Sequence, residues 1–155
     1  MGLYYSWGNI EGHSEGGGYD FSQEAYDASP GGALSTDLSV EQDAARAYLG
    51  APWRMPTSDE FQELYDNCTH VWTTLNGVNG RLFTSNVNGK TLFFPAAGDY
   101  NGTTLNNRGS NGYCWSSTYF SPTNARNLGF DSSNVLPQSS NYRRLGFTVR
   151  AVMDP

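Results

Sequence analysis

Residues 105–152 read LNNRGSNGYCWSSTYFSPTNARNLGFDSSNVLPQSSNYRRLGFTVRAV, and this stretch decides the fold. It holds two apolar anchors, Trp115–Thr118 and Gly146–Val152. The rest is rich in Asn, Ser, Tyr and Arg, and the whole stretch contains no Lys, Glu, Met, Ile or His. Fixed apolar ends around a polar, tolerant middle are typical of binding loops on a rigid scaffold. We therefore expect a recognition surface here and a scaffold in the rest of the chain.

The composition predicts one ordered domain over residues 1–155. A chain of 155 residues can bury a core of its own, and ten Tyr, eight Phe and four Trp among 18 Gly favour a turn-rich globular fold over disorder. No apolar run is long enough to cross a bilayer as a helix, and no signal peptide is visible. We expect Cys68 and Cys114 to be free thiols, because two cysteines do not make a disulfide framework.

The charge is acidic overall and unevenly distributed. The formal net charge is −6 and the pI about 4.7, which disfavours non-specific binding to nucleic acid. Residues 1–66 hold twelve acids and two bases, whereas residues 67–155 hold three acids and seven bases. This asymmetry indicates either a C-terminal binding face that tolerates acidic or polar ligands, or chance on a surface with few charges.

Two capping boxes predict two short helices. Ser39 precedes Gln42 by three residues, and Thr57 precedes Glu60 in the same way. After Thr57, apolar residues at helical spacing from Phe61 to Cys68 form one stripe. Residues 9–35, which are rich in Gly, Ser and Asp but carry aromatic residues, are expected to be a long ordered loop.

From residue 70 onward the pattern changes to short strands. Asn76-Gly77 and Asn88-Gly89 are hairpin turn signals. We expect polar loops over 99–112 and between residues 130 and 145, and strands over the ranges 70–75, 81–85, 91–94, 113–118, 128–130 and 145–152. Helices first and strands afterwards predict an α+β fold, with two short helices packed on antiparallel sheets and long loops that carry the function.

Six motifs in the same order identify a family resemblance. They are Asp43–Ala45, Trp53–Thr57, Glu60–Leu64, Phe94–Gly98, Trp115–Thr118 and Gly146–Arg150. With these motifs the chain resembles the Fibrobacter succinogenes major paralogous domain family. The resemblance implies a C-type-lectin-like fold, in the branch related to formylglycine-generating enzymes. That family has a segment before the position equivalent to Leu3, so we expect an N-terminal strand to be trimmed or supplied by another chain or segment.

Some members of that family are the variable proteins of diversity-generating retroelements. In those systems a template RNA is copied with errors at adenines, and Asn codons are the main sites of change. Such changes cannot produce Lys, Glu, Gln, Met or Trp. In residues 105–152 only Trp115 and Gln138 lie outside the reachable set. The resemblance therefore implies a diversified region, while an ordinary Asn- and Ser-rich loop remains the alternative.

Diversified positions should alternate with scaffold positions along this region. We assign Trp115, Phe130, Phe147 and Val149 to the core. The expected ligand-binding residues are those that we expect to be exposed, either in loops or on one face of a strand. They are Tyr113, Cys114, Tyr119, Phe120, Gly129, Asp131, Leu136, Ser139, Ser140, Tyr142, Arg144 and Leu145.

The residue types of this surface suit binding without catalysis. Tyr and Phe supply stiff contact area, Ser, Asn and Gly supply adaptable hydrogen bonds, and Tyr and Arg are common in binding hot spots. The resemblance implies a protein or glycan partner on a host or neighbouring cell, and display on a phage tail or bacterial surface. The acidic net charge and the lack of a long apolar run lead us to expect no nucleic acid partner and no membrane insertion. The alternative is an adhesin or structural domain of the same fold that is not diversified.

An enzyme of the formylglycine-generating type is the remaining alternative. That branch uses cysteines near the C-terminal end, but Cys114 has no companion cysteine in this half of the chain. No nucleophile elbow, zinc helix or phosphate loop is present, and His13 and His70 are the only histidines. We therefore expect no catalytic residues, no metal site and no cofactor.

Overall fold

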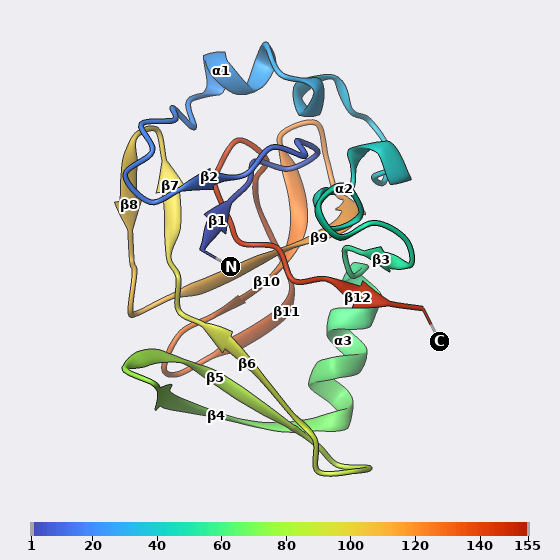
Figure 1. The fold of residues 1–155 in the computed structure, drawn as a ribbon, viewed down its shortest axis with the longest axis vertical. Coiled ribbons are helices and arrows are strands. Elements are labelled where there is room, and N and C mark those ends of the chain that lie inside the picture. Colours follow the sequence, from blue (N-terminus) through green and yellow to red (C-terminus); the bar gives the residue numbers. More distant parts are fainter. Residues whose placement is uncertain (1, 155) are drawn as a thin grey trace.

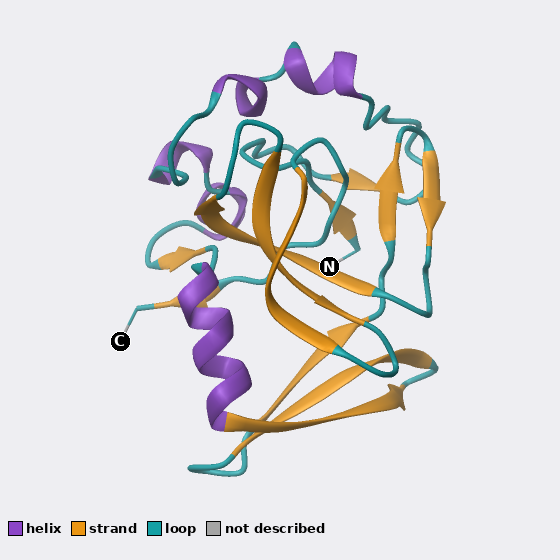
Figure 2. Cartoon of the chain, turned by 180° about the vertical axis from the view of Figure 1, so that it is seen from behind, coloured by secondary structure: helices purple, strands orange, loops and turns teal. Residues whose placement is uncertain are grey.

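The computed structural model describes residues 2–154, and its fold is α+β, as the sequence predicts. The described helices are short, and strands dominate (Figures 1 and 2). The helical elements are α1 (Gln23–Asp27), η1 (Pro30–Ala33), η2 (Val40–Gln42), α2 (Ala44–Leu49) and α3 (Ser58–Asn67). The strands in the N-terminal half are β1 (Leu3–Tyr4), β2 (His13–Ser14), β3 (Trp53–Arg54), β4 (Cys68–Leu75) and β5 (Val78–Ser85). The later strands are β6 (Thr91–Pro95), β7 (Asp99–Asn101), β8 (Thr104–Asn106), β9 (Gly112–Tyr119), β10 (Asn124–Phe130), β11 (Val135–Tyr142) and β12 (Val152–Met153).

Helix α3 begins where the capping box predicts. The Thr57 hydroxyl accepts the Glu60 backbone N–H at 3.2 Å, and the Glu60 carboxylate accepts the Thr57 N–H at 2.8 Å. The other predicted helix is different. The capping box of Ser39 and Gln42 forms, but it closes only the 3₁₀ turn η2, and Asp43 then caps α2 separately.

The central sheet has the order β11-β10-β9, and both pairings are antiparallel. One face packs on aromatic residues of the N-terminal segment and on Phe147. The other face packs on Phe61 of α3 and on Phe83 and Phe94 of the second sheet. Because both faces are covered near Trp115, this part of the sheet forms the rigid centre of the molecule (Figure 2).

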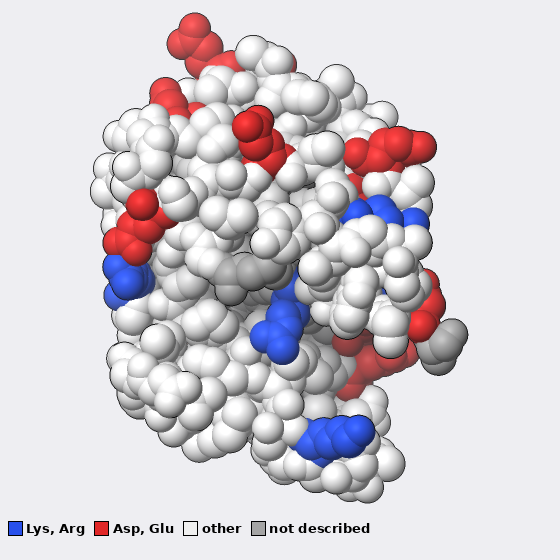
Figure 3. Space-filling view, in the orientation of Figure 1, with Lys and Arg blue, Asp and Glu red and all other residues white. Residues whose placement is uncertain are grey.

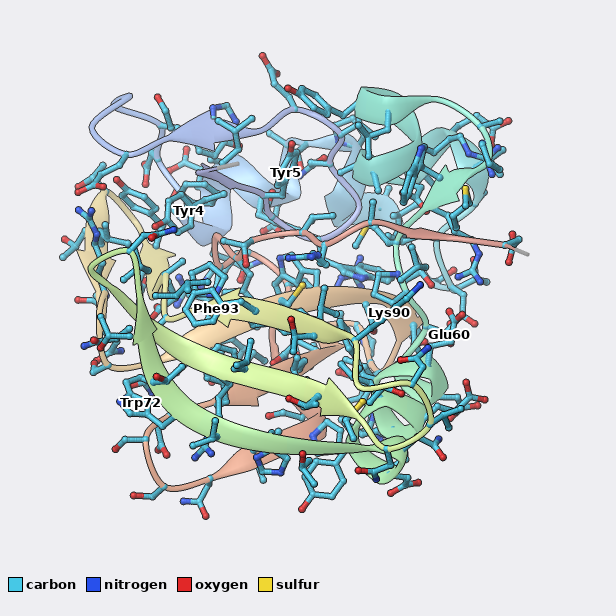
Figure 4. All side chains as sticks on the ribbon, turned by 60° about the horizontal axis from the view of Figure 1, so that its bottom comes forward. Tyr4, Tyr5, Glu60, Trp72, Lys90 and Phe93 are labelled. Atoms are coloured by element: carbon cyan, nitrogen blue, oxygen red, sulfur yellow. The ribbon has the colours of Figure 1, made fainter. Side chains whose placement is uncertain are left out.

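The second sheet, β4-β5-β6, is also antiparallel and packs across one end of the molecule. In Figure 4, which brings this sheet forward, Trp72 lies on β4 and Phe93 on β6. The predicted hairpin turn between β4 and β5 is confirmed, because Asn76 and Gly77 both have positive φ, 51° and 80°.

The two ends of the chain meet beside the central sheet. Tyr5 and Phe147 form an antiparallel bridge, with Tyr5 N–H donating to Phe147 O at 2.8 Å and Phe147 N–H donating to Tyr5 O at 3.0 Å. Further along, β12 pairs with β3. The buried residues Trp7, Trp115 and Phe147 fill the space between, which confirms the predicted core positions of the last two.

Four predicted segment boundaries are wrong. Residues 9–35 include α1 and η1, and residues 99–112 include the β7-β8 hairpin. The expected loop after residue 130 contains β11, whose polar residues and Pro137 are tolerated because β11 pairs only with β10 and is an edge strand. In the expected strand 145–152 only Val152 belongs to a regular strand, because this segment bonds in turn to Tyr5, Tyr100 and Trp115 instead of to one partner.

The acidic side chains follow the N-terminal segments. Figure 3 shows them mainly over the upper and right-hand parts of the face in view, where Figure 1 has α1, α2 and, lower down, α3. The lower left of the same face carries few charges. No helix among residues 2–154 has the length and hydropathy needed to cross a bilayer.

Candidate functional site

A hollow lies at one end of the central sheet, and Gly129 is one of the residues that line it. Across the three strands, Tyr113 of β9, Gly129 of β10 and Leu136 of β11 stand opposite one another. The hollow has a volume of about 380 Å³, and Gly129 contributes no side chain to it. The lining residues are Asn111, Tyr113, Gly129, Phe130, Asp131, Asn134, Leu136 and Ser139.

The structure thus brings five of the twelve predicted ligand-binding residues into one site. They are Tyr113, Gly129, Asp131, Leu136 and Ser139. A bulge between Asn127 and Gly129 shifts the pairing with β11, so that Leu136 pairs with Gly129 and Ser139 pairs with Asn127. Because of the bulge, the side chains of Leu136 and Ser139 lie on the same face of the sheet, and both line the hollow.

The wall formed by Tyr113 is held rigidly. Its ring stacks on the fully buried Phe147 with centroids 4.6 Å apart and planes within 14°, and Phe147 stacks in turn on Trp115. Its hydroxyl accepts a hydrogen bond from the Asn111 amide at 3.2 Å. An aromatic wall fixed in this way offers contact area with little loss of side-chain entropy on binding.

The rim at Asp131 is a tight turn that other parts of the chain hold in place. The Asp131 carboxylate accepts the backbone N–H groups of Ser133 and Asn134 at 2.7 and 2.8 Å, and these bonds lower the pKa of Asp131. The nearly buried Arg81 of β5 donates to the Asp131 backbone carbonyl at 3.2 Å. The second sheet therefore positions this rim, and the carboxylate stays ionised at neutral pH.

Asn127 lies beneath the floor of the hollow and is fully buried. Its Oδ1 accepts from the Asn141 amide at 3.3 Å and lies 3.5 Å from the place where a Cβ on Gly129 would stand. Its Nδ2 has no hydrogen-bond partner among the described residues. A buried amide with an unused donor is rare.

The other predicted residues lie outside this hollow. Phe120 and Tyr142 are exposed, while Tyr119, Ser140 and Arg144 are partly buried. The Arg126 guanidinium covers the Phe120 ring at 4.2 Å, and that of Arg144 lies 5.5 Å from the Tyr142 ring. Arg144 also donates to Asn101 at 2.6 Å, so these side chains already have partners within the chain.

Three of the assignments need correction. Cys114 and Leu145 are buried, at 2% and 8% exposure, and each packs in a hydrophobic cluster. Cys114 faces α3 because strand alternation turns it away from Tyr113, so neither Cys114 nor Leu145 belongs to the surface. Gly129 is buried as well, and it serves the hollow as its floor instead of as an exposed contact.

Sequence reasoning missed Asn111, Asn134 and Asn127 and placed Phe130 in the core alone. Phe130 is indeed buried, at 5% exposure, but it also lines the hollow. Asn111 and Asn134 lie in residues 99–112 and 131–144, which the sequence predicts to be loops, so the sequence offers no pairing register for them. The sequence VLPQSSNY of β11 has no strand-like alternation of polar and apolar residues, so no local signal indicates that strand.

Neither thiols nor metal-binding groups gather at the hollow. Cys68 and Cys114 are free, as expected from the sequence. No group of three or more His, Cys, Asp or Glu residues within 2–154 is arranged to hold a metal ion. His13 stacks on Tyr19 with centroids 3.6 Å apart, and Glu15 pairs with Arg108 at 2.5 Å.

Comparison with known proteins identifies the family. No curated protein and no solved structure matches the chain. A family model described as "Domain of unknown function (DUF8237)" matches residues 69–152. This range covers more than half of the chain and includes every residue that lines the hollow. The chain therefore belongs to the DUF8237 family.

Proposed function

We propose that this chain is a non-catalytic ligand-binding domain and that the hollow on the β9-β10-β11 sheet is its ligand site. The observation that carries the proposal is the convergence of five predicted binding residues on one concave surface. Concave sites with an apolar wall and a few placed polar groups are the usual form of small-ligand sites. The rigid Tyr113 wall and the fixed Asp131 rim supply the preorganisation that binding favours.

The test uses labelled protein on bacterial cells, since we expect the partner on a host or neighbouring cell. Leu136→Asp places a charge on the exposed wall of the hollow and should weaken cell binding at least tenfold. Val87→Asp is the matched control, because Val87 is an exposed apolar residue in the turn between β5 and β6. Flow cytometry measures both variants. Equal binding by both would remove the hollow from the ligand site.

We further propose, on the resemblance to the Fibrobacter succinogenes major paralogous domain family, that the fold is of the C-type-lectin type. The meeting of the chain ends at Tyr5 and Phe147, beside sheets joined by long connections, supports this reading. The expected N-terminal strand from another chain or segment belongs to the same proposal. A crystal structure whose strands superpose in order on a C-type lectin domain is the expected outcome, and a different strand order would contradict it.

Diversification by a retroelement, and display on a phage tail or bacterial surface, complete the proposal. They are supported by the restricted residue set of 105–152 and by the alternation of hollow-lining Tyr113 with buried Cys114 on β9. Sequencing the DNA downstream of the gene should find a near-copy of codons 105–152 that differs almost only at adenines, together with a reverse-transcriptase gene. If neither is present, the domain is a fixed adhesin and diversification is wrong.

A further inference from the structure

Nothing in the fold requires glycine at position 129. Its φ lies outside the left-handed region, where glycine is favoured. A Cβ at this position would lie 3.5 Å from Asn127 Oδ1, 3.7 Å from Tyr113 Cδ1 and 3.8 Å from Ser139 Cβ, which are ordinary van der Waals distances. The glycine therefore serves the hollow and not the backbone, because any larger side chain would occupy the space.

The lining of this space favours an uncharged ligand. No Lys or Arg lines the hollow, so it lacks the donors that phosphate or carboxylate groups require. A cation is also disfavoured, although Asp131 lies on the rim. The Arg81 guanidinium donates to the backbone carbonyl of Asp131 and offsets the charge of its carboxylate.

The polar atoms of the lining match hydroxyl groups. Asp131 Oδ1 accepts the backbone N–H groups of Ser133 and Asn134. Within residues 2–154, no hydrogen bond involves Asp131 Oδ2, the side-chain amide of Asn134 or the Ser139 hydroxyl. These free groups include both donors and acceptors. Hydroxyl groups both donate and accept, so a polyhydroxylated ring can satisfy all of them while its apolar face lies against Tyr113 and Leu136.

We propose that the hollow binds one uncharged sugar ring at the end of a neutral glycan, and that the missing side chain at position 129 makes room for that ring. The proposal rests on the ligand-binding function proposed above and names the ligand class. A volume of about 380 Å³ lies within the range of small-ligand sites, roughly 300–1,000 Å³. Residue 129 is thus the position that determines specificity at this site.

The experiment applies the purified chain to a printed panel of neutral, amino-bearing and acidic oligosaccharides. We expect binding to a subset of the neutral glycans, with affinity measured by titration of the best of them. Gly129→Leu should weaken that binding at least tenfold by filling the hollow. Ser132→Leu is the control, because it adds the same side chain at an exposed position of the neighbouring turn that does not line the hollow.

Two further variants separate loss of binding from loss of folding. Gly129→Ala adds only a Cβ with ordinary contacts, and it should weaken binding measurably without lowering the melting temperature by more than about 2 °C. Asn134→Ala removes one free amide from the rim and should weaken binding without filling the space.

Three outcomes would overturn the sugar proposal. The first is that the chain binds no neutral glycan but still binds cells, and that Leu136→Asp weakens this cell binding. In that case the hollow is a ligand site for a different class, such as a protein loop. The second is neutral-glycan binding that Gly129→Leu leaves unchanged. The third is binding to neither glycans nor cells, which would remove the proposed function as well.

Discussion

Two glycines on neighbouring strands play opposite roles. Gly112 on β9 stands across from Phe130 on β10, and a Cβ at position 112 would collide with the Phe130 ring. A Cβ on Gly129, the residue before Phe130, would make only ordinary contacts at 3.5–3.8 Å beside the hollow. Packing therefore requires glycine at position 112 but not at position 129, and the difference depends on the neighbouring side chains.

This contrast predicts different effects of the same substitution. Gly112→Ala should lower the free energy of unfolding by about 1–3 kcal/mol, the usual cost of overpacking a core. Gly129→Ala should be neutral or stabilising by up to about 1 kcal/mol, since a strand interior prefers alanine to glycine. Urea unfolding of both variants measures the difference. A cost at position 129 equal to that at 112 would mean that Gly129 is structural.

The Cys114 thiol is buried against the cluster that Phe61 and Phe94 help to form. Burial raises its pKa to about 12, although the backbone N–H of Arg150 lowers it in part. Cys68 is only half-buried. A thiol that is protonated and shielded reacts slowly, because the thiolate is the nucleophile.

Alkylation of the native chain at pH 8 should therefore modify Cys68 well before Cys114. Peptide mass spectrometry at successive times measures the two rates, and unfolding in urea should abolish the difference. Equal rates in the native chain would show that Cys114 is reachable from solvent.

At the scale of elements, the start of α3 is tied to the C-terminal strand. Arg54 on β3 donates to both Glu60 oxygens at 2.6 and 2.8 Å and to Asp154 Oδ1 at 2.8 Å. The bonds from Arg54 lower the pKa of Glu60 to about 2. This arrangement joins the capping box of α3 to the β3-β12 pair and holds three elements together.

The lowered pKa of Glu60 makes this contribution dependent on pH. It is fully present above the unfolded-state pKa of about 4.5 and is lost as the pH falls through the folded-state pKa of about 2. Glu60→Gln should cost about 1 kcal/mol or less at pH 7, because the pair is partly exposed and screened by solvent. The difference between parent and variant in urea should fall to a small fraction of its pH 7 value at pH 2. A difference that persists there would assign the effect to the capping hydrogen bonds.

At the scale of the whole molecule, Arg143 joins the N-terminal quarter to the C-terminal half. It is 2% exposed and donates to the Gly31 carbonyl at 2.7 Å and to the Pro122 carbonyl at 3.0 Å. Its guanidinium also lies 5.0 Å from the Trp7 ring. Within the described residues it has no acidic partner, so backbone carbonyls and aromatic rings hold the charge.

Arg143→Ala should lower the free energy of unfolding by about 2–4 kcal/mol, because several buried carbonyls lose a charged donor at once. Arg143→Lys should restore little of this, since an ammonium group cannot reach the same spread of acceptors as the planar guanidinium. Thermal unfolding measures both. Arg144→Ala is the control, because Arg144 is partly exposed at the neighbouring position. A full rescue by Lys would mean that charge alone is needed at this position.

The local sequence pattern was sufficient to predict much of the scaffold. The capping box at Thr57 and the turn at Asn76-Gly77 act over a few residues, so their outcome could be predicted. Strand β11 could not be recognised in the same way. Its sequence VLPQSSNY is polar, and only pairing with β10 makes it a strand. The site was therefore predicted less completely than the scaffold, because the β10-β11 register determines which residues lie next to Asn134 and Ser139.

The sequence by itself determined the α+β class, the start of α3, the burial of Trp115 and Phe147, and the region that carries the candidate site. These features depend on capping, turn chemistry and apolar anchors, which act locally. Only the tertiary structure decided that Tyr113, Gly129 and Leu136 form one hollow and that Cys114 and Leu145 face the core. The physical reason is the register between strands, because a shift of one residue turns every side chain to the opposite face. That register depends on the bulge between Asn127 and Gly129 in the β10-β11 pair and on a separate shift between Ala125 and Asn127 in the β9-β10 pair.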